Sequence, residues 1–213
     1  MPLYKTIPIS PTTSVYVWKV TEPEDELSKG IELTPHCQKR IEGMKSELHR
    51  KAFWSIRHLM AEAGYVDNDM FYDDFGKPHL HDGNHISITH SRNFTGIILS
   101  KTDEVGIDIE MQREKILRIA HKFTPLEEYR TLANTEAIIR KLTIVWGAKE
   151  SLYKIYAEQG LSFLRHIDVM DFAFDDKRTV AKIAYKGKKS HYGIEFLEFE
   201  GFTCVFAHKM MGN

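Results

Sequence analysis

The feature that most restricts what this chain can fold into is the spacing of its apolar residues, which changes pattern several times along the sequence. Alternating apolar and polar residues predict strands, whereas apolar residues three or four positions apart predict helices. Both patterns occur in each half of the 213-residue chain, and they occupy separate blocks. The sequence therefore predicts an α+β fold.

The first half contains a strand-like segment, a loop, a helical segment and a turn. Residues 13–20 (TSVYVWKV) predict a strand, and residues 21–34 predict a loop. Residues 35–64 predict a helix, which Gly43 can divide in two, and FGKP (75–78) predicts a turn. Three further strands are expected to form a β-meander: HISITH (85–90), FTGIILS (94–100) and VGIDIE (105–110).

The second half repeats this plan with longer helices. A capping box with proline in its second position (124–127) predicts a helix to about Leu132, and a second helix is expected from 134 or 135 to about 156. Four runs from Asp168 onward predict strands: FAF (172–174), TVAKIAY (179–185), YGIEFLEFE (192–200) and FTCVFAH (202–208). Because the plan occurs twice, we expect two halves of about 100 residues each.

Composition excludes several classes of protein. The 29 Lys and Arg residues nearly balance the 30 Asp and Glu residues, so the chain has no overall positive field for nucleic acid. No apolar stretch approaches the ~20 residues that span a bilayer, and the N-terminus lacks the apolar segment of a signal peptide. The two cysteines, Cys37 and Cys204, are interpreted as reduced thiols. We therefore expect a cytoplasmic protein that handles a metabolite or another protein.

A short predicted strand brings two carboxylates together. Side chains alternate along a strand, so Ile107 and Ile109 share the core face. Asp108 and Glu110 then project from the other side, about 7 Å apart, where both can reach one Mg²⁺ ion. Gly106 is expected to let a ligand approach the backbone. The alternative is a half-solvated strand whose outer face is acidic.

The helix that contains WGAKESLYK (146–154) carries a second set of candidate residues. Most of this helix is apolar, and the remaining line runs from Thr143 through Gly147 and Glu150 to Lys154. A glycine inside a helix costs up to ~1 kcal/mol relative to alanine, so something is expected to fit beside it. The alternative is a surface ion pair between Glu150 and Lys154, worth about a few tenths of a kcal/mol.

These motifs resemble those of the 4′-phosphopantetheinyl transferases. GIDIE (106–110) and WGAKES..K (146–154) are similar to the two-part signature of that family. FGKP (75–78) and ITHS (88–91) resemble two further blocks of its larger, Sfp-type class. The four blocks occur in the family's order and spacing over roughly residues 75–160.

The resemblance implies a fold of two similar α+β halves, each a β-meander packed on helices, related by a pseudo-twofold axis. Residues 1–104 are expected to form the half that holds the nucleotide end of coenzyme A. Residues 105–213 are expected to form the half that binds Mg²⁺. A chain built in this way has less need to self-associate, so we expect a monomer.

The resemblance also implies an activity. The expected enzyme transfers the phosphopantetheine arm of coenzyme A to a serine hydroxyl of an apo acyl or peptidyl carrier protein and releases adenosine 3′,5′-bisphosphate. Asp108, Glu110 and Glu150 would hold Mg²⁺ on the pyrophosphate of coenzyme A, and Lys154 would contact the same phosphates. Glu150 is also the candidate base for the carrier serine, either directly or through a metal-bound water.

Five further residues are candidates for the nucleotide end of coenzyme A. By resemblance, Lys77, Thr89 and His90 would contact the 3′-phosphate end, although many relatives carry serine at the position of Thr89. Arg50 and Arg57 lie seven positions apart, on one face of the predicted helix. Either arginine can reach a phosphate in this arrangement, or can be an ordinary solvated charge on a helix.

Other functions would use some of the same residues. A non-catalytic carrier-protein binder would be expected to lack one of the charged positions, and a Mg²⁺-dependent phosphohydrolase would use the same carboxylates. Four histidines could suggest zinc, but they span a turn and a strand start rather than a helix: His79, His81, His85 and His90. Four lysines form either a docking surface for an acidic carrier or a solvated hairpin: Lys182, Lys186, Lys188 and Lys189.

Overall fold

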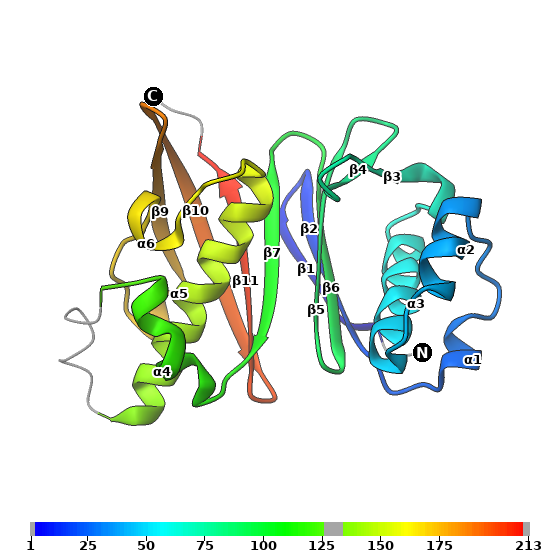
Figure 1. Cartoon of the computed structure of the whole chain (residues 1–213), viewed down its shortest axis with the longest axis horizontal. Helices are drawn as coiled ribbons and strands as arrows, with labels where there is room; N and C mark the ends of the chain where they lie inside the picture. Colours follow the sequence, from blue (N-terminus) through cyan, green and yellow to red (C-terminus); the bar gives the residue numbers. More distant parts are fainter. Residues whose placement is uncertain (1–2, 126–133, 211–213) are drawn as a thin grey trace. The chain divides into compact units, whose positions relative to one another are not determined.

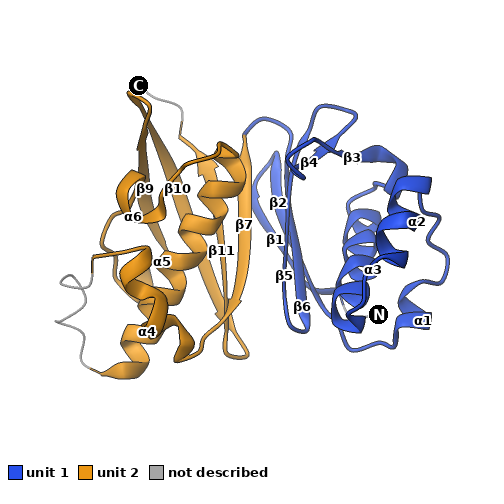
Figure 2. Ribbon diagram, in the orientation of Figure 1, with its two compact units in different colours: residues 1–103 blue, residues 104–213 orange. Residues whose placement is uncertain are grey.

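A computed structural model describes residues 3–125 and 134–210 of the chain. The chain forms two compact units, Met1–Asp103 and Glu104–Asn213, which Figure 2 shows in different colours. The described residues form three antiparallel sheets and six α-helices, which confirms the predicted α+β class. None of the helices in these ranges has the length and apolar character that crossing a membrane requires.

A four-stranded sheet and a long helix make the core of unit 1. The strands, in sheet order, are β1 (Leu3–Ser10), β2 (Thr13–Lys19), β6 (Phe94–Ser100) and β5 (His85–Ser91). Helix α3 (Glu47–Glu62) packs on β2 and β6, as Figure 1 shows. Its apolar face buries Ile56, Leu59 and Met60 against the sheet, which is the outcome expected of an amphipathic helix.

The predicted helix over residues 35–64 is two helices. Helix α2 (Pro35–Glu42) begins at Thr34, whose hydroxyl accepts a hydrogen bond from the Cys37 amide, and it ends at Gly43. Helix α3 then starts after Ser46, so the break occurs where the glycine predicted it. A short helix, α1 (Glu24–Leu27), lies in the segment that was expected to be a loop.

Three strands of unit 1 were not anticipated. Strand β1 contains one proline, Pro8, which is tolerated because β1 is an edge strand that pairs only with β2. Strands β3 (Met70–Tyr72) and β4 (Pro78–Leu80) form a separate hairpin, and each has only three residues. A period of two cannot be recognised over so short a run. The predicted turn at FGKP lies at the end of this hairpin.

Unit 2 is a five-stranded sheet with a long helix on one face. The strands, in sheet order, are β7 (Val105–Met111), β11 (Phe202–Lys209), β10 (Lys188–Phe199), β9 (Arg178–Tyr185) and β8 (Ile167–Val169). Helix α5 (Thr135–Tyr156) packs on β7 and β11 (Figure 1). The Asn134 side chain caps it by accepting a hydrogen bond from the Ala137 amide. Two short helices, α4 (Lys115–Ile119) and α6 (Phe163–His166), complete the described part of the unit.

Two details of the predicted strand order are wrong. The three runs from residue 85 to 110 are strands, but they do not form one meander, because β5 pairs with β6 whereas β7 pairs with β11 in the other sheet. Both edges of β6 are occupied, by β2 and β5. The FAF segment (172–174) is not a strand: Phe172 lies in an irregular segment and Phe174 begins a short 3₁₀ helix (Phe174–Asp176), and both pack against the core of unit 2. Most of the helix predicted from the capping box at 124–127 lies outside the described residues.

The two sheets nevertheless share an order of elements. In unit 1, β2 is followed by α3 and then by the β5–β6 hairpin, whose second strand pairs with β2. In unit 2, β7 is followed by α5 and later by the β10–β11 hairpin, whose second strand pairs with β7. In both units the long helix packs on the first and last strands of this set.

Candidate active site

Strand β7 turns its carboxylates toward helix α5. Asp108 is only 7% exposed, and its Oδ1 accepts a hydrogen bond from Lys154 Nζ at 2.9 Å. The same ammonium donates to the carbonyl oxygen of Ile107 at 2.7 Å. The predicted alternation along the strand is present, because Ile107 and Ile109 are both buried. The alternative of a half-solvated acidic face is wrong for Asp108, since α5 packs on this side of β7.

Gly106 serves the packing of α5 on β7. A Cβ atom built on Gly106 would lie 2.0 Å from the backbone oxygen of Ser151 and 3.1 Å from Ile155 Cγ1. No side chain fits in that space, so the glycine brings the helix close enough for Lys154 to reach Asp108. The predicted role of Gly106, the close approach of a ligand, is therefore corrected to the close approach of a helix.

Gly106→Ala is expected to lower the free energy of unfolding by about 3 kcal/mol, because the helix must move away from the strand. The measurement is a urea titration of both proteins. Gly43→Ala is the matched control, since a Cβ atom there would lie 3.6 Å from its nearest neighbours in a right-handed conformation. An unchanged midpoint in Gly106→Ala would show that the helix and strand are not this close.

Gly147 makes room on α5 for a neighbouring side chain, as its place inside the helix predicted. A Cβ atom on Gly147 would lie 2.7 Å from Val205 Cγ2 and 3.8 Å from Asp108 Oδ2. The neighbour that fits beside the glycine is thus the side chain of Val205 on β11. Gly147 also keeps the space over the Asp108 carboxylate free of a side chain from α5.

Three carboxylates of unit 2 lie within electrostatic range of one another. Burial, together with the charges of Asp108 and Glu110 and against the opposing effect of Lys154, raises the pKa of Glu150 to about 7. Burial and the Asp108 charge also raise the pKa of Glu110. A glutamate from the middle of α5 therefore lies within electrostatic range of the two acidic residues of β7.

Two residues near Glu110 were not among the predicted site residues. The Trp146 side chain hydrogen-bonds to Glu110, and the charge of Arg113 also favours its ionised form, so both lower its pKa. A hollow of about 190 Å³ lies beside them, lined also by Thr143. The spacing of Trp146 along the helix indicates only that it belongs to an apolar stripe. Its indole N–H bonds to Glu110 on a distant strand, and a local sequence pattern cannot predict that contact.

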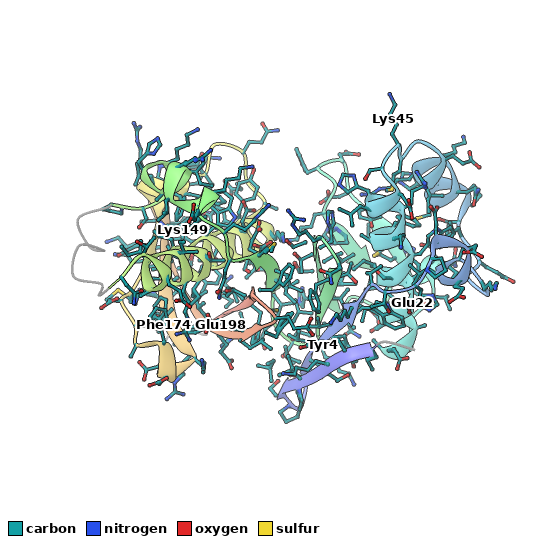
Figure 3. The ribbon with its side chains drawn as sticks, turned by 90° about the horizontal axis from the view of Figure 1, so that it is seen from below. Tyr4, Glu22, Lys45, Lys149, Phe174 and Glu198 are labelled. Atoms are coloured by element: carbon teal, nitrogen blue, oxygen red, sulfur yellow. The ribbon has the colours of Figure 1, made fainter. Side chains whose placement is uncertain are left out.

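Lys149 is a buried cation that positions the helix. It is 3% exposed, and Figure 3 labels it on α5. Its ammonium donates to the carbonyl oxygens of Phe123 at 2.6 Å, Phe163 at 2.8 Å and Ile167 at 2.7 Å. These bonds offset the cost of burying the charge. They tie α5, one residue before Glu150, to α6, to β8 and to the segment after α4.

The residues predicted to meet the nucleotide lie in unit 1. Lys77 is in the loop of the β3–β4 hairpin, and Thr89 and His90 are on β5. Thr89 is buried, whereas His90 is exposed and its ring centroid lies 5.5 Å from that of His49 on α3. Their contact with a nucleotide stays a prediction.

The two arginines of α3 are engaged inside unit 1. Arg50 donates to both carboxylate oxygens of Glu24, at 2.8 and 3.0 Å, and to the carbonyl oxygen of Met44. Arg57 is 4% exposed and donates to Asp67 Oδ1 at 2.9 Å. Arg57 could reach a phosphate only by leaving this buried ion pair. In this structure Arg57 therefore has a structural role.

The candidates for zinc and for docking have local partners. His79 Nε2 lies 3.0 Å from Asp73 Oδ2. Lys186 pairs with Glu158 at 2.9 Å, and its φ of 49° followed by 77° at Gly187 forms a tight hairpin turn. Within the described ranges, no three side chains of His, Cys, Asp or Glu are arranged as a ready metal site.

Comparison with known families identifies the second unit. Residues 104–207, about half of the chain, match the model of the 4′-phosphopantetheinyl transferase superfamily. No curated protein matches the chain. The matched segment contains Asp108, Glu110, Glu150 and Lys154. Unit 2 of this protein is therefore a domain of the 4′-phosphopantetheinyl transferase superfamily.

Proposed function

We propose that this protein transfers the 4′-phosphopantetheine arm of coenzyme A to a serine hydroxyl of an apo acyl or peptidyl carrier protein. The other product is adenosine 3′,5′-bisphosphate. The superfamily match supports a transferase of this general kind. The observation that supports the proposal is the ion pair of Lys154 on α5 with Asp108 on β7 at 2.9 Å, beside which Glu150 lies within range of the charges of Asp108 and Glu110.

The donor set of this site fits Mg²⁺. Three carboxylates supply the oxygen ligands that this ion prefers, and their mutual repulsion, which raises the pKa of Glu150, would be relieved by a divalent cation. Asp108, Glu110 and Glu150 would hold the ion. When bound, Mg²⁺ neutralises charge on the pyrophosphate of coenzyme A.

The remaining groups of the site suit phosphoryl-type transfer. Lys154, which pairs with Asp108 in this structure, would offset the negative charge of the incoming phosphates. The bond between the serine oxygen and the β-phosphorus forms as the pyrophosphate P–O bond breaks. Glu150 is the proposed base for the serine proton, and because its pKa of about 7 belongs to the metal-free site, a bound cation would lower it. The leaving oxygen departs with adenosine 3′,5′-bisphosphate.

Unit 1 would hold the nucleotide end of coenzyme A. Lys77, Thr89 and His90 are the residues proposed to contact it, and Arg50 would join them by exchanging Glu24 for a phosphate. The shared order of elements in the two units supports two similar halves, as in the larger, Sfp-type class. Arg57 would not join these contacts, because it is buried in an ion pair with Asp67.

A mass measurement of the carrier tests the proposal. The protein is incubated with coenzyme A, Mg²⁺ and a panel of apo carrier proteins, and each carrier is weighed. A gain of one phosphopantetheine on at least one carrier is expected, and none on a carrier whose acceptor serine is replaced by alanine. Release of nucleotide without carrier modification would indicate a phosphohydrolase. Carrier binding without any reaction would indicate a non-catalytic binder.

A further inference from the structure

A single aspartate organises the loop that carries Lys77. The loop spans residues 73–77 between β3 and β4. Asp73 Oδ1 accepts hydrogen bonds from the backbone amides of Phe75 and Lys77, both at 2.9 Å. The backbone of Asp73 also bonds to the loop, since its amide donates to the Lys77 carbonyl at 3.0 Å and its carbonyl accepts from Gly76 at 2.9 Å. Side chain and main chain of one residue thus close the loop.

The second carboxylate oxygen of Asp73 is held by the following strand. His79 Nε2 lies 3.0 Å from Asp73 Oδ2, and the His79 ring stacks on Phe71 across the hairpin with centroids 5.3 Å apart. The hydrogen bonds from His79 and from the Lys77 amide lower the pKa of Asp73, so the carboxylate is ionised at neutral pH. Both carboxylate oxygens of Asp73 are therefore held, Oδ1 by the loop amides and Oδ2 by His79.

The shape of the loop depends on these bonds. Gly76 has φ of +82°, a left-handed conformation that an isolated chain adopts as one of many states. Asp73 selects that state by bonding to the residues on either side of Gly76. The backbone of Lys77 is thereby set before any ligand arrives, and a preordered group loses less entropy on binding.

We propose that Asp73 is a positioning residue for coenzyme A, which fixes the backbone at Lys77 so that the lysine meets the 3′-phosphate end of the nucleotide. This inference rests on the proposed function, because Lys77 matters only if coenzyme A binds. Asp73 itself would not contact the substrate. It acts through Lys77.

The test measures coenzyme A binding by calorimetry, together with KM and kcat for transfer, in Asp73→Ala and Asp73→Asn. Asp73→Ala is expected to weaken binding and raise KM about tenfold, with kcat at saturating coenzyme A changed less than about twofold. Asp73→Asn keeps an oxygen that accepts both amide bonds, so it should bind within about twofold of the original protein. Lys77→Ala should show the same rise in KM as Asp73→Ala.

A double variant and a control separate positioning from general stability. Because Asp73 acts through Lys77, combining Asp73→Ala with Lys77→Ala should weaken binding no more than Lys77→Ala alone. Asp82→Ala removes a similar loop bond in the same unit, from Asp82 Oδ1 to the Asn84 amide at 2.9 Å, and should leave binding unchanged.

The outcomes distinguish the two proposals. Equal binding by Asp73→Ala and the original protein, or additive losses in the double variant, would overturn the role of Asp73 while leaving the proposed transfer standing. If the original protein binds no coenzyme A and modifies no carrier, the proposed function is wrong, and the role of Asp73 falls with it.

Discussion

Asp108→Asn is expected to lower kcat/KM for phosphopantetheine transfer about 1,000-fold at physiological Mg²⁺. The substitution removes one negative charge from the site but keeps the size of the side chain and an oxygen that accepts the Lys154 hydrogen bond. The fold should therefore be retained. The loss of activity reflects weaker binding of the cation, which leaves the charge of the substrate phosphates less well neutralised. The measurement is the rate of mass gain of an apo carrier protein over a range of Mg²⁺ concentrations.

Asp168→Asn is the matched control, because Asp168 is an exposed aspartate on β8 of the same unit. It should transfer at the original rate, and the thermal midpoints of both variants should stay within a few degrees of the original protein. A transfer rate in Asp108→Asn within about tenfold of the original would show that this carboxylate is not part of the metal site. Recovery of its rate at high Mg²⁺ would instead indicate weakened ion binding.

Local pattern and long-range contact explain which parts of the fold were predictable. The long helices and most long strands carry their period over seven or more residues, so their type and bounds follow from sequence alone. The partner of β7 does not, because it depends on β11, almost one hundred residues later in the chain. The close approach that Gly106 permits is likewise a contact with Ser151, which no local window includes.

The distinction between local sequence pattern and long-range contact also holds for the candidate active site. The order of four motifs pointed to Asp108, Glu110, Glu150 and Lys154, because charged residues in a fixed order along the chain are visible in the sequence. The role of Lys149 was not visible, since its three partners are backbone carbonyl oxygens, which every residue possesses. Interactions of this kind become predictable only when the packing is known.

Arg57 has a buried partner that its spacing did not predict. Its spacing from Arg50 was compatible with a phosphate contact, but its partner is Asp67 in a short 3₁₀ turn after α3. Asp67 also accepts hydrogen bonds from the backbone amide and the hydroxyl of Thr34 at the start of α2. The ion pair therefore joins two helices and a turn, and breaking a buried pair of this kind costs about 3 kcal/mol or more.

Glu150→Gln is expected to abolish transfer, with a loss of about 1,000-fold or more, and to stabilise the metal-free protein at high pH. The pKa of Glu150 is about 7 in the folded protein, above the ordinary value of 4.5. Between these two values the unfolded chain releases the Glu150 proton, whereas the folded protein keeps it. Stability that is present below pH 4.5 is therefore lost as the pH rises to about 7. Glutamine does not titrate, so this loss is absent in the variant.

The stability difference between Glu150→Gln and the original protein is thus expected to grow from pH 4.5 to about 7 and to stay constant above it, at about 3 kcal/mol at most. Urea titrations with a chelator present measure it, and Glu136→Gln, at an exposed position of the same helix, should show no such dependence. Added Mg²⁺ should stabilise the original protein at high pH and leave Glu150→Gln nearly unchanged, because the ion offsets the repulsion among three carboxylates. A stability difference that does not vary with pH would mean that Glu150 is not buried beside Asp108 and Glu110, and the proposed metal site would lose its helical ligand.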